Sequence, residues 1–122
     1  MTTEPKLRTV LFVDDEAYLL SALVRAFRKY THWQSLTATS GEQALALLEV
    51  QHVDAIVSDM RMPRMHGSEL LDLVGKRYPA ICRVMLTGST SGEIIIPDYH
   101  MLYKPCKVES LIRILDGPPG PP

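Results

Sequence analysis

Cysteine is scarce in this chain. The 122 residues include only two, Cys82 and Cys106, too few for the disulfide framework of a small secreted domain. No apolar run approaches the roughly 18 residues that a membrane-spanning helix needs, and the first residues lack the apolar segment of a signal peptide. We therefore expect a protein of a reducing cytoplasm that does not cross a membrane.

A surplus of positive charge is also missing. Thirteen Lys and Arg residues stand against fourteen Asp and Glu, giving a net charge of −1. Domains that bind nucleic acid usually carry a basic surplus, so direct binding of nucleic acid is not expected. The four histidines, at positions 32, 52, 66 and 100, show no zinc-ligand spacing with a cysteine. A zinc protein is therefore not expected either.

What the chain does have is a regular alternation of short apolar runs and longer segments with helical periodicity. Strands are predicted over residues 9–13, 34–38, 55–57, 83–86 and 101–103. A helix over residues 17–30 is predicted after the first strand. Ser40 has the position of an N-cap that opens a second helix, with Gln43 three residues later. A third helix ends near Tyr78, before Pro79, and a last one starts at Val108.

This alternation predicts an α/β fold in which a parallel sheet is covered on both faces. A doubly wound, flavodoxin-like three-layer sandwich with five strands in the order 2-1-3-4-5 suits the chain length. A (β/α)₈ barrel would need about twice as many residues. We expect residues 1–116 to form one domain and the Pro- and Gly-rich residues 117–122 to be a tail or stiff linker.

The connection between the fourth and fifth predicted strands is short. Sixteen residues separate Thr87 from Lys104. Pro97 disfavours helical dihedral angles at Ile96, and successive β-branched residues form helices poorly. We therefore expect the helix between these strands to be shortened or missing, and this segment to be mobile.

Polar side chains collect where the predicted strands end. Asp14 and Asp15 follow the first strand, Asp59 the third, Thr87 the fourth and Lys104 the fifth. Ligands of open α/β sheets bind at this carboxyl edge, so the three carboxylates are expected to meet there. Their mutual repulsion is relieved by a hard cation, and a few oxygen ligands with open water positions suit Mg²⁺. The sequence therefore predicts a Mg²⁺ site beside a lysine and a threonine.

Together with their neighbours, these residues resemble the receiver domain of two-component response regulators. The matching motifs, in the order of the family, are VDDE at 13–16, SDMRMP at 58–63, Gly67, MLTG at 85–88 and KP at 104–105. The resemblance implies a phosphoacceptor domain that takes a phosphoryl group from a histidine kinase or a histidine phosphotransfer protein. It implies a regulatory domain, not an enzyme, although such a domain assists its own phosphorylation and dephosphorylation.

The resemblance also implies a role for each acidic residue. Asp59 would be the phosphoacceptor, and Asp15 and Asp59 would bind Mg²⁺ through carboxylate oxygens. Asp14 would orient a water on the metal, and the main-chain carbonyl of Arg61 would complete the protein ligands. By this resemblance, the metal group of the site would be Asp14, Asp15, Asp59 and Arg61.

The remaining site residues would handle the phosphoryl group. Thr87 would bond to it and Lys104 would pair with it, and the resemblance implies a cis peptide bond between Lys104 and Pro105. The aromatic residue that usually stands three positions before this lysine is replaced by Met101. We therefore expect phosphorylation to act by ordering residues 88–99.

Two other functions remain as alternatives. One is a Mg²⁺-dependent phosphohydrolase with an aspartyl-phosphate intermediate, although the second spaced aspartate of that chemistry is absent after Asp14 and Asp15. The other is a receiver-like binding module that is never phosphorylated. The kinase, the oligomeric state and the output remain open, and the output domain could follow the tail or lie on another chain.

Overall fold

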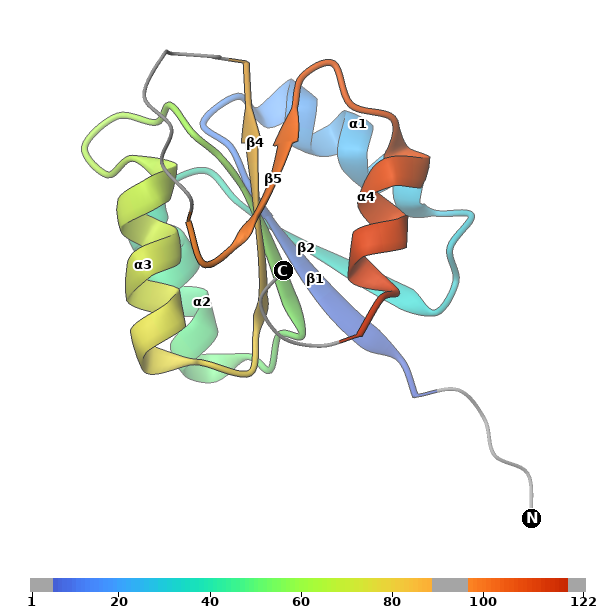
Figure 1. Cartoon of the computed structure of the whole chain (residues 1–122), viewed down its shortest axis with the longest axis horizontal. Helices are drawn as coiled ribbons and strands as arrows, with labels where there is room; N and C mark the ends of the chain where they lie inside the picture. The colour runs from blue at the N-terminus through green and yellow to red at the C-terminus, as the bar shows by residue number, and fades with distance from the viewer. Residues whose placement is uncertain (1–5, 89–96, 119–122) are drawn as a thin grey trace.

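The protein is built on one parallel sheet. The computed structural model describes residues 6–88 and 97–118. Its strands are β1 (Arg8–Val13), β2 (Trp33–Ala38), β3 (Ala55–Asp59), β4 (Cys82–Thr87) and β5 (His100–Tyr103). They pair in the order β2-β1-β3-β4-β5, and every pair is parallel (Figure 1). The predicted strand order is confirmed.

Helices cover both faces of this sheet. They are α1 (Ala17–Phe27), α2 (Gly41–Val50), α3 (Gly67–Arg77) and α4 (Val108–Leu115). Figure 1 shows α2 and α3 on one face and α1 and α4 on the other. Alternate side chains of β1 point to opposite faces: Val10 and Phe12 join the core under α1 and α4, and Leu11 and Val13 join the core under α2 and α3. The three-layer sandwich is therefore as predicted.

The N-terminus of α2 is capped by the residue that the sequence indicated. The side chain of Ser40 accepts a hydrogen bond from the main-chain N–H of Gln43 (3.1 Å), which satisfies one of the unpaired donors of the first turn. The Gln43 side chain reaches back to the N–H of Thr39 (2.6 Å). In the usual capping box that reciprocal bond goes to the cap residue itself, so the box is shifted here by one residue.

Arg83 of β4 joins the sheet to α3 and to the segment before β5. It donates hydrogen bonds to the main-chain oxygen of Leu71 (2.9 Å) and to the carboxylate of Asp98 (2.9 Å). Its guanidinium lies 5.7 Å from the ring centroid of Tyr99. Gly75 of α3 leaves room for this arrangement, because a Cβ there would stand 2.5 Å from Arg83 Nη1.

The expected shortening of the connection between β4 and β5 falls on a part of the chain that is not described. Residues 89–96 lie outside the described residues, and so does most of the predicted switch segment 88–99. On the described side of that gap, Tyr99 is buried in the core under α2 and α3. The four helices named above are therefore those of the described residues alone.

The end of α4 is tied to β2 by Asp116 and to β1 by the main chain of Leu115. The Asp116 carboxylate accepts a hydrogen bond from Trp33 Nε1 (2.7 Å) and pairs with His32 Nε2 (2.9 Å). Burial acts to raise the pKa of Asp116, but these two bonds outweigh it and hold the pKa below its ordinary value. The Arg8 guanidinium stacks 4.6 Å above the Trp33 ring and donates to the main-chain oxygen of Leu115 (3.2 Å). Trp33 is thus a packing residue, in agreement with its burial.

Two expectations from composition can be compared with the described residues. Among them, no helix reaches the length and hydrophobicity that a membrane crossing requires. Cys82 and Cys106 are both free thiols. Burial raises the pKa of each thiol, so neither is set up as a reactive thiolate.

Candidate functional site

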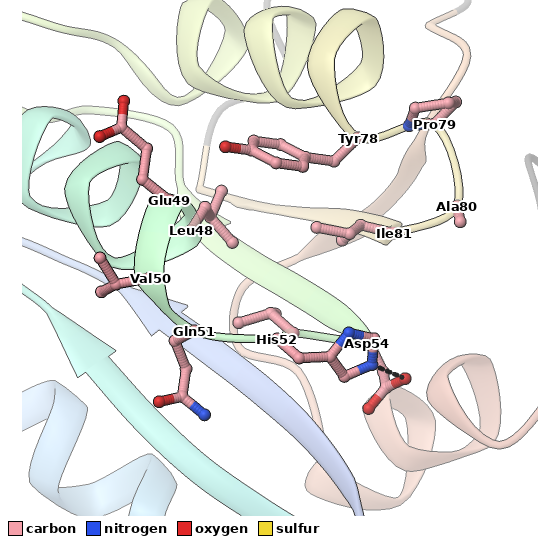
Figure 2. Close-up of a pocket in the computed structure, with 11 residues that line it drawn as sticks. Leu48, Glu49, Val50, Gln51, His52, Asp54, Tyr78, Pro79, Ala80 and Ile81 are labelled. Atoms are coloured by element: carbon pink, nitrogen blue, oxygen red, sulfur yellow. Dashed lines mark hydrogen bonds and ion pairs between the residues drawn. The ribbon is translucent and has the colours of Figure 1, made fainter.

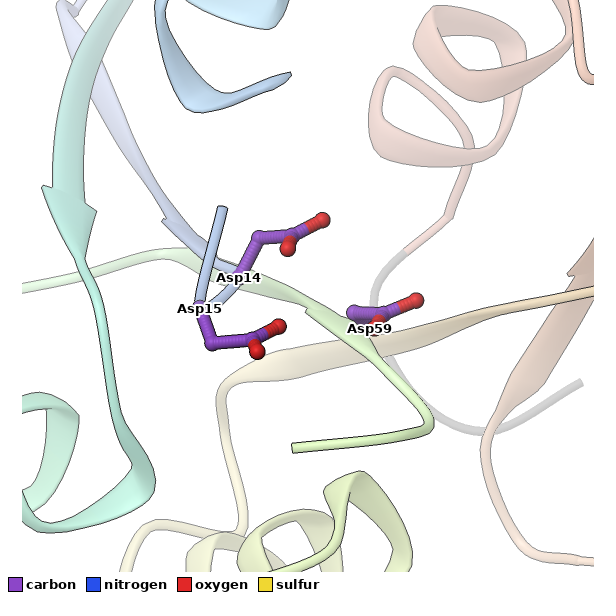
Figure 3. Close-up of side chains that lie close together, drawn as sticks. All are labelled: Asp14, Asp15 and Asp59. Carbon is purple, nitrogen blue, oxygen red and sulfur yellow. The ribbon is translucent and has the colours of Figure 1, made fainter. Parts of the chain in front are cut away.

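Three carboxylates meet at the carboxyl edge of the sheet, as the sequence predicts. Asp14 and Asp15 directly follow β1, and Asp59 is the last residue of β3. One oxygen of each lies within 4.8 Å of an oxygen of the other two (Figure 3). They differ in exposure: Asp14 is buried, Asp59 is half-buried and Asp15 is exposed. This set of hard oxygen donors, open on one side, suits a divalent cation.

The buried carboxyl group of Asp14 has a raised pKa. Burial raises its pKa, and the nearby negative charges of Asp59 and Asp15 raise it further. A hydrogen bond from the main-chain N–H of Glu16 (2.9 Å) and the positive charge of Lys104 act in the opposite direction. The net effect is a raised pKa, so the ionised form of Asp14 is disfavoured in this fold.

Lys104 supplies the positive charge that faces the cluster. Its Nζ lies 2.7 Å from Asp59 Oδ1. Burial acts to lower the pKa of Lys104, but the hydrogen bond and the charge of Asp59 outweigh it, so the pKa is raised. The ammonium form is therefore the one present at neutral pH. The peptide bond between Lys104 and Pro105 is cis, as the resemblance implied.

Thr87 ends β4 beside the cluster and is almost fully buried, at 1% exposure. Its hydroxyl donates a hydrogen bond to the sulfur of Met60, at 3.0 Å. The main-chain oxygen of Thr87 accepts a bond from the N–H of Lys104 (2.8 Å). The two residues that were predicted to contact a phosphoryl group are therefore held side by side at the ends of neighbouring strands.

All of the site residues described above except Asp14 border one pocket of about 480 Å³. Its lining consists of Asp15, Glu16, Asp59, Met60, Arg61, Thr87, Gly88 and Lys104. Sequence reasoning missed Glu16 and Met60. Glu16 could have been found from its place directly after the two aspartates. Met60 could not be found from strand alternation, because the chain leaves the sheet after Asp59 and alternation no longer applies.

A glycine brings the start of α3 close to the phosphoacceptor candidate. A Cβ at Gly67 would collide with the main-chain oxygen of Asp59. The N–H of Gly67 donates to the main-chain oxygen of Met60 (2.9 Å). Any larger residue would push the loop between β3 and α3 away from the site, which explains why a glycine belongs to the motif.

A second pocket, also of about 480 Å³, lies at the opposite edge of the sheet, near the ends of α2 and α3 (Figure 2). Its polar pair is His52 and Asp54, with His52 Nε2 3.1 Å from Asp54 Oδ1. The other carboxylate oxygen of Asp54 accepts a bond from the N–H of Thr9 (2.8 Å). Asp54 is thus engaged in holding β1 beside the start of β3, and the described residues bring no cluster of three ligating side chains to this pocket. The acidic pocket is therefore the candidate site.

Comparison with known proteins agrees with the resemblance that the sequence motifs indicate. Residues 10–116 match the family model of the response regulator receiver domain. The hydrogenase transcriptional regulatory protein HoxA of Cupriavidus necator is 38% identical over 113 residues, which are 88% of this chain and 23% of that protein. The autoinducer 1 sensor kinase/phosphatase LuxN of Vibrio campbellii is 36% identical over 85 residues, 70% of this chain and 10% of that protein.

Solved structures share the fold. A signal receiver domain of an HD domain-containing protein from Pseudomonas fluorescens superposes with a TM-score of 0.77 at 28% identity. The superposition covers 90% of this chain and 92% of that one. The curated relatives named above are much longer than this chain, which spans a quarter or less of their length.

Proposed function

The chain belongs to the receiver-domain family of two-component systems, and from this premise we propose that Asp59 is its phosphoacceptor. The observation that carries the proposal is the cluster of Asp14, Asp15 and Asp59 faced by the Lys104 ammonium, 2.7 Å from Asp59. A nucleophile, oxygen ligands for a cation and a positive charge are the groups that phosphoryl transfer to a carboxylate requires.

The proposed reaction forms an acyl phosphate. A carboxylate oxygen of Asp59 attacks phosphorus, the bond from phosphorus to the donor imidazole nitrogen breaks, and that imidazole keeps the electron pair. Mg²⁺ would be held by Asp15, Asp59 and the main-chain carbonyl of Arg61, with Asp14 orienting a bound water. When bound, it neutralises charge on the transferring oxygens. Burial first, and then the like charges of Asp59 and Asp15, raise the pKa of Asp14, and a bound cation would relieve the repulsion among these charges.

Lys104 and Thr87 would bind the transferred group. The Lys104 ammonium already pairs with Asp59, so it is in place to pair with the phosphoryl oxygens that replace this charge. The Thr87 hydroxyl borders the same pocket and would donate a hydrogen bond to a phosphoryl oxygen. A hydrogen bond that exists in only one state is a means of switching between the two.

The wider assignments follow from the family and are also proposals. The donor would be a histidine kinase or a histidine phosphotransfer protein, and the chain would act by a change of its surface. Residues 1–116 would be the receiver unit, with 117–122 as a tail or linker. We place the protein in the cytoplasm, where two free thiols such as Cys82 and Cys106 persist.

Intact-mass spectrometry after incubation with acetyl phosphate tests the assignment. We expect the wild type to gain the mass of one phosphoryl group with Mg²⁺ and not with EDTA. The Asp59→Asn variant should gain nothing. Asp72→Asn is the matched control, because Asp72 is an exposed carboxylate on α3 away from the acidic pocket, and it should behave as the wild type. Equal modification of the Asp59→Asn variant would refute the proposal.

A further inference from the structure

One hydrogen bond at the site joins Thr87 to a residue with no part in the proposed chemistry. The Thr87 hydroxyl donates to Met60 Sδ at 3.0 Å. The two residues are 27 positions apart in sequence and border the same pocket as Asp59. Thr87 is at 1% exposure, so its hydroxyl is shielded from water.

The main chain of Met60 is fixed on both sides. Its N–H donates to the main-chain oxygen of Leu86 (3.1 Å), and its own oxygen accepts from the N–H of Gly67 (2.9 Å). Its half-buried side chain packs against the core under α2 and α3. The thioether therefore stands beside Thr87 because the loop is tied to β4 and to α3, not through a chance rotamer of an exposed residue.

We propose that Met60 is a positioning residue that sets how readily Thr87 moves to the phosphoryl group. This proposal rests on the proposed function, since it assumes that Thr87 bonds to a phosphoryl oxygen after Asp59 is modified. In the unmodified protein the Met60 sulfur is an acceptor of the Thr87 hydroxyl. Switching exchanges this acceptor for a phosphoryl oxygen.

The chemistry of the two acceptors gives the exchange its direction. A thioether sulfur is a weak acceptor, whereas an ionised phosphoryl oxygen forms a short and strong hydrogen bond. A carbon in place of the sulfur would weaken the hold on Thr87 in the unmodified state. The amide oxygen of a glutamine lies one bond further along the side chain than the sulfur and is a better acceptor, so it would strengthen that hold. The switched population should therefore rise with leucine and fall with glutamine at position 60.

Beryllium fluoride is a stand-in for the phosphoryl group on a carboxylate. Titration with it measures how readily the protein reaches the switched state. The readout is NMR of the Thr87 methyl group in the presence of Mg²⁺. We expect Met60→Leu to lower the half-saturating concentration about threefold to tenfold, the factor that one modest hydrogen bond corresponds to. We expect Met60→Gln to raise it by a similar factor.

Two controls separate positioning from packing. Met62→Leu makes the same change of side chain in the same loop, at a residue buried in the core under α2 and α3, and should leave the half-saturating concentration unchanged. Thr87→Val removes the donor, so the differences among the residue 60 variants should vanish in that background when binding is followed at the Met62 methyl group. In the unmodified protein, Thr87→Val should also shift the Met60 methyl signal.

The outcomes distinguish the two proposals. If the wild type responds and the variants rank as stated, Met60 positions Thr87. If the wild type responds, three results would each show that the positioning role is wrong. The Met60 variants could match the wild type, or their differences could persist in the Thr87→Val background. The third such result is a Met62→Leu variant with the same effect as Met60→Leu. If the wild type responds neither to beryllium fluoride nor to acetyl phosphate, the proposed function fails, and the role of Met60 fails with it.

Discussion

Replacement of Asp14 by asparagine should stabilise the protein when no divalent cation is present. Asp14 is 5% exposed, and its carboxylate stands among those of Asp15 and Asp59. Burial and these like charges raise its pKa, so the fold disfavours the ionised form of this carboxyl group. Asparagine removes the charge and keeps an oxygen that can accept the N–H of Glu16.

The size of the effect can be worked out from the distances. The carboxylate oxygens lie within 4.8 Å of one another, and two like charges at that outer limit repel by about 3 kcal/mol at an effective dielectric constant near 20 and by about 1 kcal/mol in bulk water. Lys104 offsets part of the repulsion from Asp59, and Asp15 is exposed to solvent. We therefore expect Asp14→Asn to raise the free energy of unfolding by about 1–2 kcal/mol. For a domain of this size, that is a rise in Tm of roughly 4–10 °C.

Thermal unfolding followed by circular dichroism at pH 7 is the assay. In EDTA the Tm should rank Asp14→Asn above the wild type, with the Asp72→Asn control near the wild type. With saturating Mg²⁺ the wild type should gain more than the variant, because a ligand stabilises the state that binds it more tightly. An Asp14→Asn protein that melts below the wild type in EDTA would refute the electrostatic reasoning.

Two further predictions concern residues away from the pocket. Because the folded pKa of Asp116 is lowered, its stabilising contribution is complete above the ordinary carboxyl pKa and is lost as pH falls from that value through the lowered folded pKa. The Tm difference between wild type and Asp116→Asn should therefore start to shrink below about pH 4, and a constant difference as the pH falls through the whole acid range would contradict this. Ser40→Ala removes the cap of α2 and should cost about 1 kcal/mol in urea unfolding; an unchanged midpoint would show that the cap contributes nothing.

The sheet order and the acidic cluster could be predicted because both follow from local patterns. Apolar runs alternate with helical periodicity, and parallel strands bring their carboxyl ends to one edge. Together with the strand order of a doubly wound sheet, which makes the first and third strands neighbours, these regularities place Asp14, Asp15 and Asp59 together. The cap at Ser40 was equally accessible, since its partner is only three residues away.

Contacts between distant residues could not be predicted in this way. The bond from Thr87 to Met60 depends on how the loop turns after β3, and no periodicity describes that turn. The hydrogen bond of Trp33 to Asp116 spans 83 positions and depends on where α4 ends against the sheet. In both cases the sequence shows the polar groups but not their partners, because side-chain pairing is decided by packing after the elements have formed.

The close fit between Gly75 and Arg83 restricts the order in which this sequence can change. Glycine inside a helix such as α3 costs about 1 kcal/mol relative to alanine, so an alanine at position 75 would ordinarily be favoured. Here its Cβ would stand 2.5 Å from a guanidinium nitrogen whose group is bonded to Leu71 and Asp98. An alanine at position 75 therefore requires the Arg83 guanidinium to shift from these partners, which offsets the gain in helix propensity unless Arg83 has first been replaced. An arginine reintroduced at position 83 after Gly75→Ala would meet the new Cβ. Loss of Arg83 followed by Gly75→Ala is therefore easier to acquire than to reverse.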